Sequence, residues 1–261
     1  MSYDGTAFHG WQVQPGLRTV QGNLASALQE ITGERVLPQG SGRTDAGVHA
    51  LGQVASFALD APIPAPNLLR ALNRTLPSNI RVLAAEKVPT NFHARHSAFS
   101  KTYEYRIFER KRSPGGEVEE ERVCSPFLAS FAWDCRWSLS LDLMQQAAAH
   151  LCGTHDFSSF AASDPDLAQR SNPGSGVNPV KTIYTSEVRR TGEVLTYRII
   201  GSGFLHHMVR NIVGTLVEVG RGSLTPEDIP LILAARDRSA AGPTAPPQGL
   251  FLVEVDYGEH L

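Results

Sequence analysis

Apolar residues recur at helical spacing in two stretches of the first hundred residues. In the first stretch they lie three or four positions apart, at Val20, Leu24, Leu28 and Ile31. Thr19 precedes them, and its side-chain oxygen can cap a helix. Residues 67–76 repeat the pattern after three closely spaced prolines. The spacing predicts one amphipathic helix in each stretch.

Short apolar runs between and around these helices predict strands. They lie at the start of the chain near Tyr3 and at residues 35–37, 53–59 and 80–88. The predicted order is therefore strand, helix, strand, strand, helix, strand. This order is typical of a ferredoxin-like fold, in which two helices cover one face of a sheet.

The second half of the chain also mixes strands with helices. Residues 100–108 alternate with period two, which places Tyr103, Tyr105 and Ile107 on one face of a strand. Further strands are expected at 183–190, 194–200 and 250–257, and helices at 138–152, at 204–219 and from Thr225 onward. In the helix at 204–219, His206 and Arg210 are expected on one flank, four positions apart. Residues 109–137 and 158–180 lack periodicity and are expected to be loops.

Together these patterns predict an α+β protein. The element order is similar in the two halves, which favours two related ferredoxin-like (RRM-like) halves that share one mainly antiparallel sheet, with a cleft between them. The expected division is residues 1–98 and residues 99–261.

Composition describes an ordinary globular protein, with 41% hydrophobic and 19% charged residues. Cys124, Cys135 and Cys152 show no Cys-x-x-Cys spacing, so we expect reduced thiols in a cytoplasmic protein. No apolar run approaches the length of a membrane span, and no leader is apparent, so no membrane association is expected.

The net charge of −2 does not by itself indicate a nucleic-acid partner. Phosphate binding requires local rather than total positive charge. Such density occurs at Arg95, His96, Lys101, Arg106, Arg110, Lys111 and Arg112. The composition therefore permits RNA binding without demonstrating it.

The segment from Gly40 to His49 carries the densest candidate chemistry. Glycines at 40, 42 and 47 can adopt positive φ, and they surround one carboxylate, Asp45, and one guanidinium, Arg43. A functional loop between strands fits this composition. An ordinary turn fits it as well, because Asp favours local hydrogen bonds.

The whole string Gly-Arg-Thr-Asp-Ala-Gly-Val-His at residues 42–49 resembles the signature of the TruA family of tRNA pseudouridine synthases. Residues 8–12 (Phe-His-Gly-Trp-Gln) and 208–214 (Met-Val-Arg-Asn-Ile-Val-Gly) are similar to two further family segments. The resemblance spans nearly the whole chain. It implies the predicted architecture, with Asp45 as the catalytic nucleophile.

The resemblance also implies the reaction. Family members isomerise uridines 38, 39 and 40 in the anticodon stem-loop of tRNA to pseudouridine, without cofactor or metal. They are homodimers, and one tRNA spans both subunits. The carboxylate adds to C1′ of the sugar or to C6 of the uracil, and both routes are covalent catalysis by one Asp.

Two further catalytic residues are carried over by the same resemblance. Arg210 would keep the nucleophilic carboxylate ionised, although a solvated helix flank is the simpler interpretation. Tyr103 would pack on the uracil and serve in proton transfer, although half-buried strand tyrosines are common.

The candidate substrate contacts are Tyr103, Arg43, His49, His206 and Arg95. Arg43 would bind the flipped-out nucleotide or its phosphates, or would hold the loop through an ion pair. None of the histidines has a metal-ligand spacing such as His-x-x-x-His, so no metal site is expected.

The same residues bear on three other functions. The segment at 40–44 lacks the Gly-Lys-Ser/Thr ending of a phosphate-binding loop. A phosphate-transferring hydrolase would place a second carboxylate two residues after Asp45, where Gly47 stands. A non-catalytic RNA-binding protein on the same fold remains the alternative, although a pure binder gains nothing from a carboxylate facing phosphates.

Overall fold

The computed structural model describes residues 1–112, 120–163 and 178–258. The chain forms two compact units. Unit 1 comprises Met1–Thr102 and Phe251–Leu261, and unit 2 comprises Tyr103–Leu250. The division falls within two strands, because β6 (Ser100–Glu109) and β13 (Leu250–Asp256) each contribute residues to both units.

The main strands of unit 1 are short and pair in the order β5, β1, β3, β13. Besides β13, these strands are β1 (Ser2–Tyr3), β3 (His49–Ala50) and β5 (Ile80–Arg81). β1 is antiparallel to both β3 and β5, whereas β3 is parallel to β13. A separate antiparallel pair joins β2 (Gln39–Gly40) to β4 (Ala55–Ser56). β2 and β3 flank the Asp45 segment, so strands anchor it at both ends.

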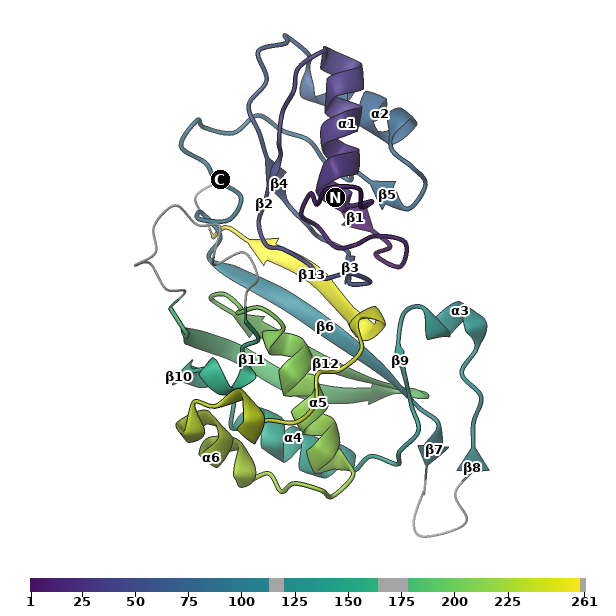
Figure 1. The fold of residues 1–261 in the computed structure, drawn as a ribbon, viewed down its shortest axis with the longest axis vertical. Coiled ribbons are helices and arrows are strands. Elements are labelled where there is room, and N and C mark those ends of the chain that lie inside the picture. Colours follow the sequence, from purple (N-terminus) through teal and green to yellow (C-terminus); the bar gives the residue numbers. More distant parts are fainter. Residues whose placement is uncertain (113–119, 164–177, 259–261) are drawn as a thin grey trace. The chain divides into compact units, whose positions relative to one another are not determined.

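Two helices of unit 1 lie beside one another, α1 (Val20–Thr32) and α2 (Ala65–Thr75) (Figure 1). The Thr19 hydroxyl caps α1 by accepting the Gly22 N–H, and Gly33 ends the helix in the left-handed region at φ 78°. Both helices follow their apolar spacing, so the sequence-based prediction of these two elements is confirmed.

The predicted strands of unit 1 are longer than those observed. Residues 35–37 are not a strand, and Leu37 is 54% exposed. The strand expected over 80–88 keeps regular pairing only at Ile80–Arg81. Beyond Arg81, the Asn73 side chain hydrogen-bonds both backbone groups of Val82: it donates to the Val82 carbonyl and accepts the Val82 N–H. Side-chain hydrogen bonds thus replace the ladder that apolar composition alone predicted.

The main strands of unit 2 pair in the order β10, β11, β12, β6. The bounds of the first three are β10 (Gly153–Asp156), β11 (Val180–Thr191) and β12 (Val194–Gly201). β11 is antiparallel to both β10 and β12, and β9 (Trp133–Cys135) pairs with β6 in parallel. Tyr103, Tyr105 and Ile107 are all buried on β6, as the period-two pattern predicted.

The helices of unit 2 cover these strands. They are α4 (Leu141–Ala149), α5 (Met208–Gly220) and α6 (Asp228–Ala235). α4 packs against both α5 and β11 (Figure 1). The prediction that α5 begins at Phe204 is wrong, because His207 has a left-handed backbone with φ 59° that helix cannot continue through. His206 therefore precedes the helix and does not share a flank with Arg210.

Residues 109–137 contain more structure than the predicted loop. Short strands lie at Lys111–Arg112 (β7) and Glu120–Glu121 (β8), which pair, and a short helix, α3 (Pro126–Ala129), precedes β9. A short 3-10 helix occupies Ser158–Phe160 at the start of the second predicted loop. The second predicted loop also ends one residue early, because Val180 already belongs to β11, and residues 113–119 and 164–177 of the two predictions lie outside the described residues.

The fold is therefore α+β, with mainly antiparallel strand pairing in each unit. Across the described ranges, no helix is long and apolar enough to cross a membrane.

Candidate functional site

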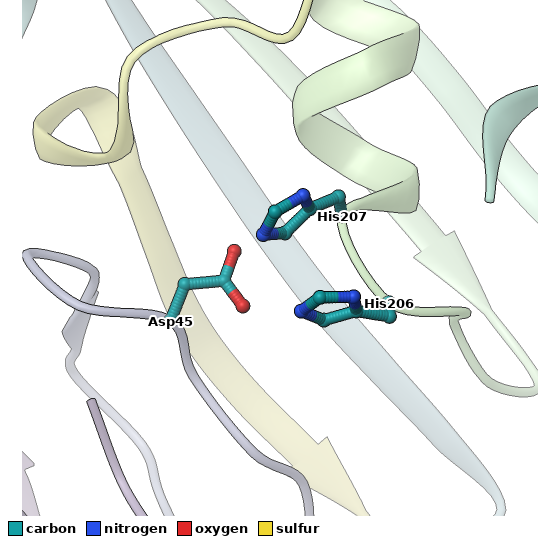
Figure 2. A group of neighbouring side chains, drawn as sticks. All are labelled: Asp45, His206 and His207. Atoms are coloured by element: carbon teal, nitrogen blue, oxygen red, sulfur yellow. The ribbon is translucent and has the colours of Figure 1, made fainter. Parts of the chain in front are cut away.

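Asp45 lies half-buried on the loop between β2 and β3, and Arg43 on the same loop is exposed. The Asp45 carbonyl accepts the Val48 N–H at 3.1 Å, which closes a tight turn. Figure 2 shows the Asp45 carboxylate carried by this loop. A carboxylate in such a position can act as a nucleophile or as a general base.

The glycines near this loop are needed mainly because other groups pack closely against their backbone, and less because the backbone has positive φ. Of the three glycines expected to reach positive φ, only Gly47 does so, at 78°. Gly40 instead lies against the Trp11 ring, where an added Cβ would come within 2.6 Å. Gly10, at φ 84°, meets the Thr44 carbonyl, which a Cβ would approach to 2.5 Å. The aromatic and glycine residues of the 8–12 string therefore pack directly under the Asp45 loop.

His49 lies beneath the loop rather than at its surface. Its side chain is 1% exposed and stacks on Phe251 at 4.7 Å between ring centroids. Its Nδ1 accepts the Gly5 N–H at 3.0 Å, so the lone pair on this nitrogen is engaged by the backbone. The structure thus ties His49 to the support of the loop, and its predicted role in substrate binding stays a prediction.

Arg95 belongs to a group of basic residues before and within β6. The His93 and His96 rings contact one another in a tilted arrangement with centroids 4.4 Å apart, and the Arg95 backbone N–H donates to Nδ1 of His93. Partial burial, together with the positive charge of these neighbours, lowers the pKa of His96. Lys101 extends from the group to the loop, where its Nζ donates to the Ser41 carbonyl at 2.7 Å. This contact connects the basic residues to the Asp45 segment within unit 1.

Tyr103 and Tyr105 occupy adjacent positions on the buried side of β6 in unit 2. Tyr103 is 7% exposed and packs edge-on against Phe204 at 4.9 Å. Tyr105 is fully buried, and its hydroxyl donates to the Pro246 carbonyl at 2.7 Å. Burial raises the pKa of Tyr105 well above its usual value, and the positive charge of Arg210 opposes that rise. The Tyr105 phenol is therefore protonated at neutral pH.

Arg210 lies in the first turn of α5, and two hydrogen bonds join it to the segment that precedes β13. Its Nε donates to the Ala245 carbonyl at 2.8 Å, and the Ala245 N–H donates back to the Arg210 carbonyl. Asn211, the next residue, is fully buried, and its amide bonds Phe160, Arg238 and Thr244. The bond from Nε to Ala245 restricts the orientation of the Arg210 side chain, and the Asn211 bonds hold the adjacent turn of α5.

His206 and His207 form a stacked pair immediately before α5, with ring centroids 3.9 Å apart (Figure 2). The His206 ring bonds the Ser163 carbonyl at 2.9 Å, and the His206 carbonyl accepts the Ala162 N–H. Within either unit taken alone, the described residues contain no set of three His, Cys, Asp or Glu side chains placed to share one metal ion. The expectation of a metal-free site stays a prediction.

The predicted residues thus fall into two sets. Unit 1 holds Arg43, Asp45, His49 and Arg95, and unit 2 holds Tyr103, Arg210 and His206. Sequence reasoning missed the polar residues that hold these sets in place, chiefly Gln53 and Asn211. A polar residue inside an apolar run, as at Gln53, was the available signal.

Comparison with known proteins identifies the family. The sequence model of the family described as "tRNA pseudouridine synthase" matches residues 1–97 and 147–258. A protein from Solibacter usitatus named "tRNA pseudouridine synthase A" is 48% identical over 257 residues, which cover 98% of this chain and 97% of that protein. Proteins with the same name from Moorella thermoacetica and Bacillus pumilus are each 45% identical, over 260 and 259 residues, with 98% of this chain and 97% of each relative covered. On this evidence, the chain belongs to the tRNA pseudouridine synthase family.

Proposed function

We propose that this chain is an isomerase that converts uridines 38, 39 and 40 of the tRNA anticodon stem-loop to pseudouridine, with Asp45 as the nucleophile. Membership of the family supports the reaction and the tRNA substrate. The observation that carries the proposal is the half-buried Asp45 on a tight loop, within the complete 42–49 signature.

The reaction breaks the bond between C1′ and N1, turns the uracil, and joins C1′ to C5. The target uridine first leaves the base stack, because no side chain reaches the reacting atoms of a stacked base. The Asp45 carboxylate then attacks either C1′ of the sugar or C6 of the ring, forming a covalent intermediate. The bond to Asp45 is broken again before product release, by attack of C5 on C1′ in the first route or by elimination from C6 in the second, which regenerates the free carboxylate. The hydrogen on C5 is lost as a proton after the new bond forms, so no redox step is needed.

Arg210 and Tyr103 complete the catalytic set that we propose. A carboxylate in a partly dry site needs a cation to keep it ionised, and Arg210 supplies it. The hydrogen bond from Arg210 Nε to Ala245 supports this role, because it restricts the directions in which the guanidinium can point. Tyr103 packs on the uracil and takes part in proton transfer at C5.

The remaining candidates serve substrate binding. Arg43 and Arg95 bind phosphates, which position RNA without reading its sequence. His206 contacts the RNA, and His49 contributes through the loop that it supports from below.

The architecture that we propose is that of two ferredoxin-like halves, residues 1–98 and 99–261, that share one sheet and hold the catalytic cleft between them. The alternation of strands and helices in each unit supports this arrangement. We further propose a cytoplasmic homodimer in which one tRNA spans both subunits.

The test is to incubate the protein with unmodified tRNA transcripts and map pseudouridine at every uridine. We expect modification at positions 38 to 40 by the unaltered chain and by Asp60→Ala, a control at an exposed aspartate of the same unit. Asp45→Ala should abolish modification while retaining tRNA binding.

Two results would contradict the proposal in different ways. Modification at other positions would support the reaction but show that the target uridines are not 38 to 40. Tight tRNA binding without any modification by the unaltered chain would favour the alternative, a non-catalytic RNA-binding protein.

A further inference from the structure

We infer that a buried hydrogen-bond chain centred on Gln53, and including Tyr3, positions Asp45 for attack. The inference rests on the proposed function, since it assigns to these residues the orientation of the proposed nucleophile. All of the contacts lie within unit 1.

Gln53 is fully buried, and its side-chain amide is engaged at both ends. Its Oε1 accepts the Ser41 hydroxyl at 2.7 Å and the Val54 N–H at 3.1 Å. Its Nε2 donates to the Gly42 carbonyl at 3.0 Å. One side chain therefore holds two consecutive residues of the segment that leads to Asp45.

Tyr3 extends the chain to the residue adjacent to Asp45. Its hydroxyl lies 3.4 Å from Nε2 of Gln53, which donates to it, and 2.9 Å from the Thr44 hydroxyl. Either hydroxyl of the Tyr3–Thr44 pair can donate to the other, so the Tyr3 oxygen links the Gln53 amide to Thr44 in both cases. Burial raises the pKa of Tyr3 to about 12 although both hydrogen bonds oppose the rise, so the phenol retains its proton at neutral pH.

Backbone carbonyls on the same segment are held by further donors. The Ser41 carbonyl accepts from Lys101 Nζ at 2.7 Å, and the Thr44 carbonyl accepts the Trp11 N–H at 3.0 Å. The segment from Ser41 to Thr44 is thus held by residues from outside the loop, namely Tyr3, Trp11, Gln53, Val54 and Lys101. Such over-determination is expected where a reactive group must be held in one geometry.

The arrangement matters for the reaction because buried polar networks act as units. Removing one member leaves its partners without hydrogen bonds in an environment that water does not reach, and the segment relaxes to satisfy them. A shift of about 1 Å in a reacting group costs on the order of a hundredfold in rate. We therefore assign Gln53 and Tyr3 as positioning residues, because they act on the substrate only through Asp45.

The test uses two substitutions that preserve shape, Tyr3→Phe and Gln53→Met, in the full chain. Under saturating enzyme, the rate of a single turnover on tRNA transcript should fall about 10- to 100-fold in each. The dissociation constant for tRNA should change by less than about threefold, because phosphate contacts dominate affinity. A purely structural role would lower the melting temperature and leave the rate of the folded protein unchanged.

Tyr197→Phe is the matched control. Tyr197 is also fully buried, and its hydroxyl also lies 2.9 Å from a buried hydroxyl, that of Ser186, but in unit 2 on β12. It should lose a similar amount of thermal stability and keep its turnover rate. The inference is overturned if Tyr3→Phe and Tyr197→Phe have the same turnover rate. If Gln53→Met does not fold, the Tyr3 comparison decides alone.

Asp45→Ala separates the inference from the function on which it rests. If Asp45→Ala is active, Asp45 is not the nucleophile, and Gln53 and Tyr3 have no nucleophile to position. An inactive Asp45→Ala protein beside a fully active Tyr3→Phe protein would retain the function and reject the inference.

Discussion

At the scale of single residues, buried amides bond the backbone and side chains near two of the three proposed catalytic groups, Asp45 and Arg210. Gln53 does so beneath the Asp45 loop, and Asn211 does so beside Arg210. Neither amide is reachable from solvent. A buried amide without partners is costly, and both the oxygen and the nitrogen of each of these two amides are hydrogen-bonded.

Asn211→Ala should therefore destabilise the protein and impair catalysis together. The substitution removes the partner of the Phe160 carbonyl and one hydrogen bond each from Arg238 and Thr244, which still bond one another at 3.2 Å. With about 1–3 kcal/mol for each buried group left unsatisfied, a loss of roughly 2–4 kcal/mol is expected after relaxation. Urea denaturation measures the loss, and single-turnover kinetics on the folded fraction measure the effect on Arg210. Unchanged stability would show that water or another group replaces the amide.

Residue types at the site were only partly predictable from sequence. The Asp45 segment stands out because glycines, a carboxylate and a guanidinium occur together in one short string. Gln53 and Asn211 do not stand out in the sequence. Gln53 is one polar position in an apolar run, and Asn211 is a polar position on a helix. The bonds from these amides to Gly42 and Phe160 join residues 11 and 51 positions apart in the chain. Only the folded chain reveals such pairs.

At the scale of elements, helices were predicted better than strands because a helix is specified locally. α1 begins one residue after Thr19, where the cap and the apolar spacing agree. Strands depend on partners far along the chain, and several predicted strands of unit 1 reduce to two residues each. The start of α5 was missed because the left-handed backbone of His207 has no sequence signature.

Gly214→Ala in α5 should destabilise the protein, the opposite of the usual effect. Within an exposed helix, this change stabilises by about 1 kcal/mol, because alanine favours helix. Here the new Cβ would lie 1.6 Å from the Pro243 carbonyl oxygen, so α5 and the neighbouring segment would have to separate. A fall in melting temperature is expected, with reduced turnover because Ala245 on that segment binds Arg210. A rise in melting temperature would show that the close approach is not maintained in solution.

Thr19→Ala tests the helix that packs nearest the 8–12 string. The Thr19 hydroxyl caps α1 and is almost fully buried. Its loss should cost about 1 kcal/mol, measured by urea denaturation. Thr19→Ser, which keeps the capping oxygen, should recover most of that stability. Equal loss in both variants would assign the effect to the missing methyl group instead of the cap.

At the scale of the whole molecule, a net charge of −2 must still allow binding to a polyanion. Local clustering resolves this, since Arg95, His93, His96 and Lys101 lie near one another in unit 1. Affinity for tRNA should accordingly fall steeply with salt, because bound counterions are released when basic side chains replace them.

Arg95→Ala should weaken tRNA binding at low salt and reduce the slope of log affinity against log salt by about 1. Arg74→Ala, at the exposed end of α2, is the matched control and should leave the slope unchanged. Filter binding over a salt series measures both. An unchanged slope in Arg95→Ala would remove Arg95 from the phosphate contacts.

The central claim is that Asp45 carries out the isomerisation, and the fate of the C5 hydrogen reports on it directly. In tRNA that carries tritium at C5 of uridine, formation of the bond between C1′ and C5 releases the label into water. The measurement is the rate of tritium release in a single turnover by the unaltered chain and by Asp45→Asn, which keeps the shape and removes the charge. We predict release by the unaltered chain and a rate at least about a thousandfold lower in Asp45→Asn with tRNA still bound. Release by Asp45→Asn at a rate near that of the unaltered chain would contradict the assignment of Asp45 as the nucleophile.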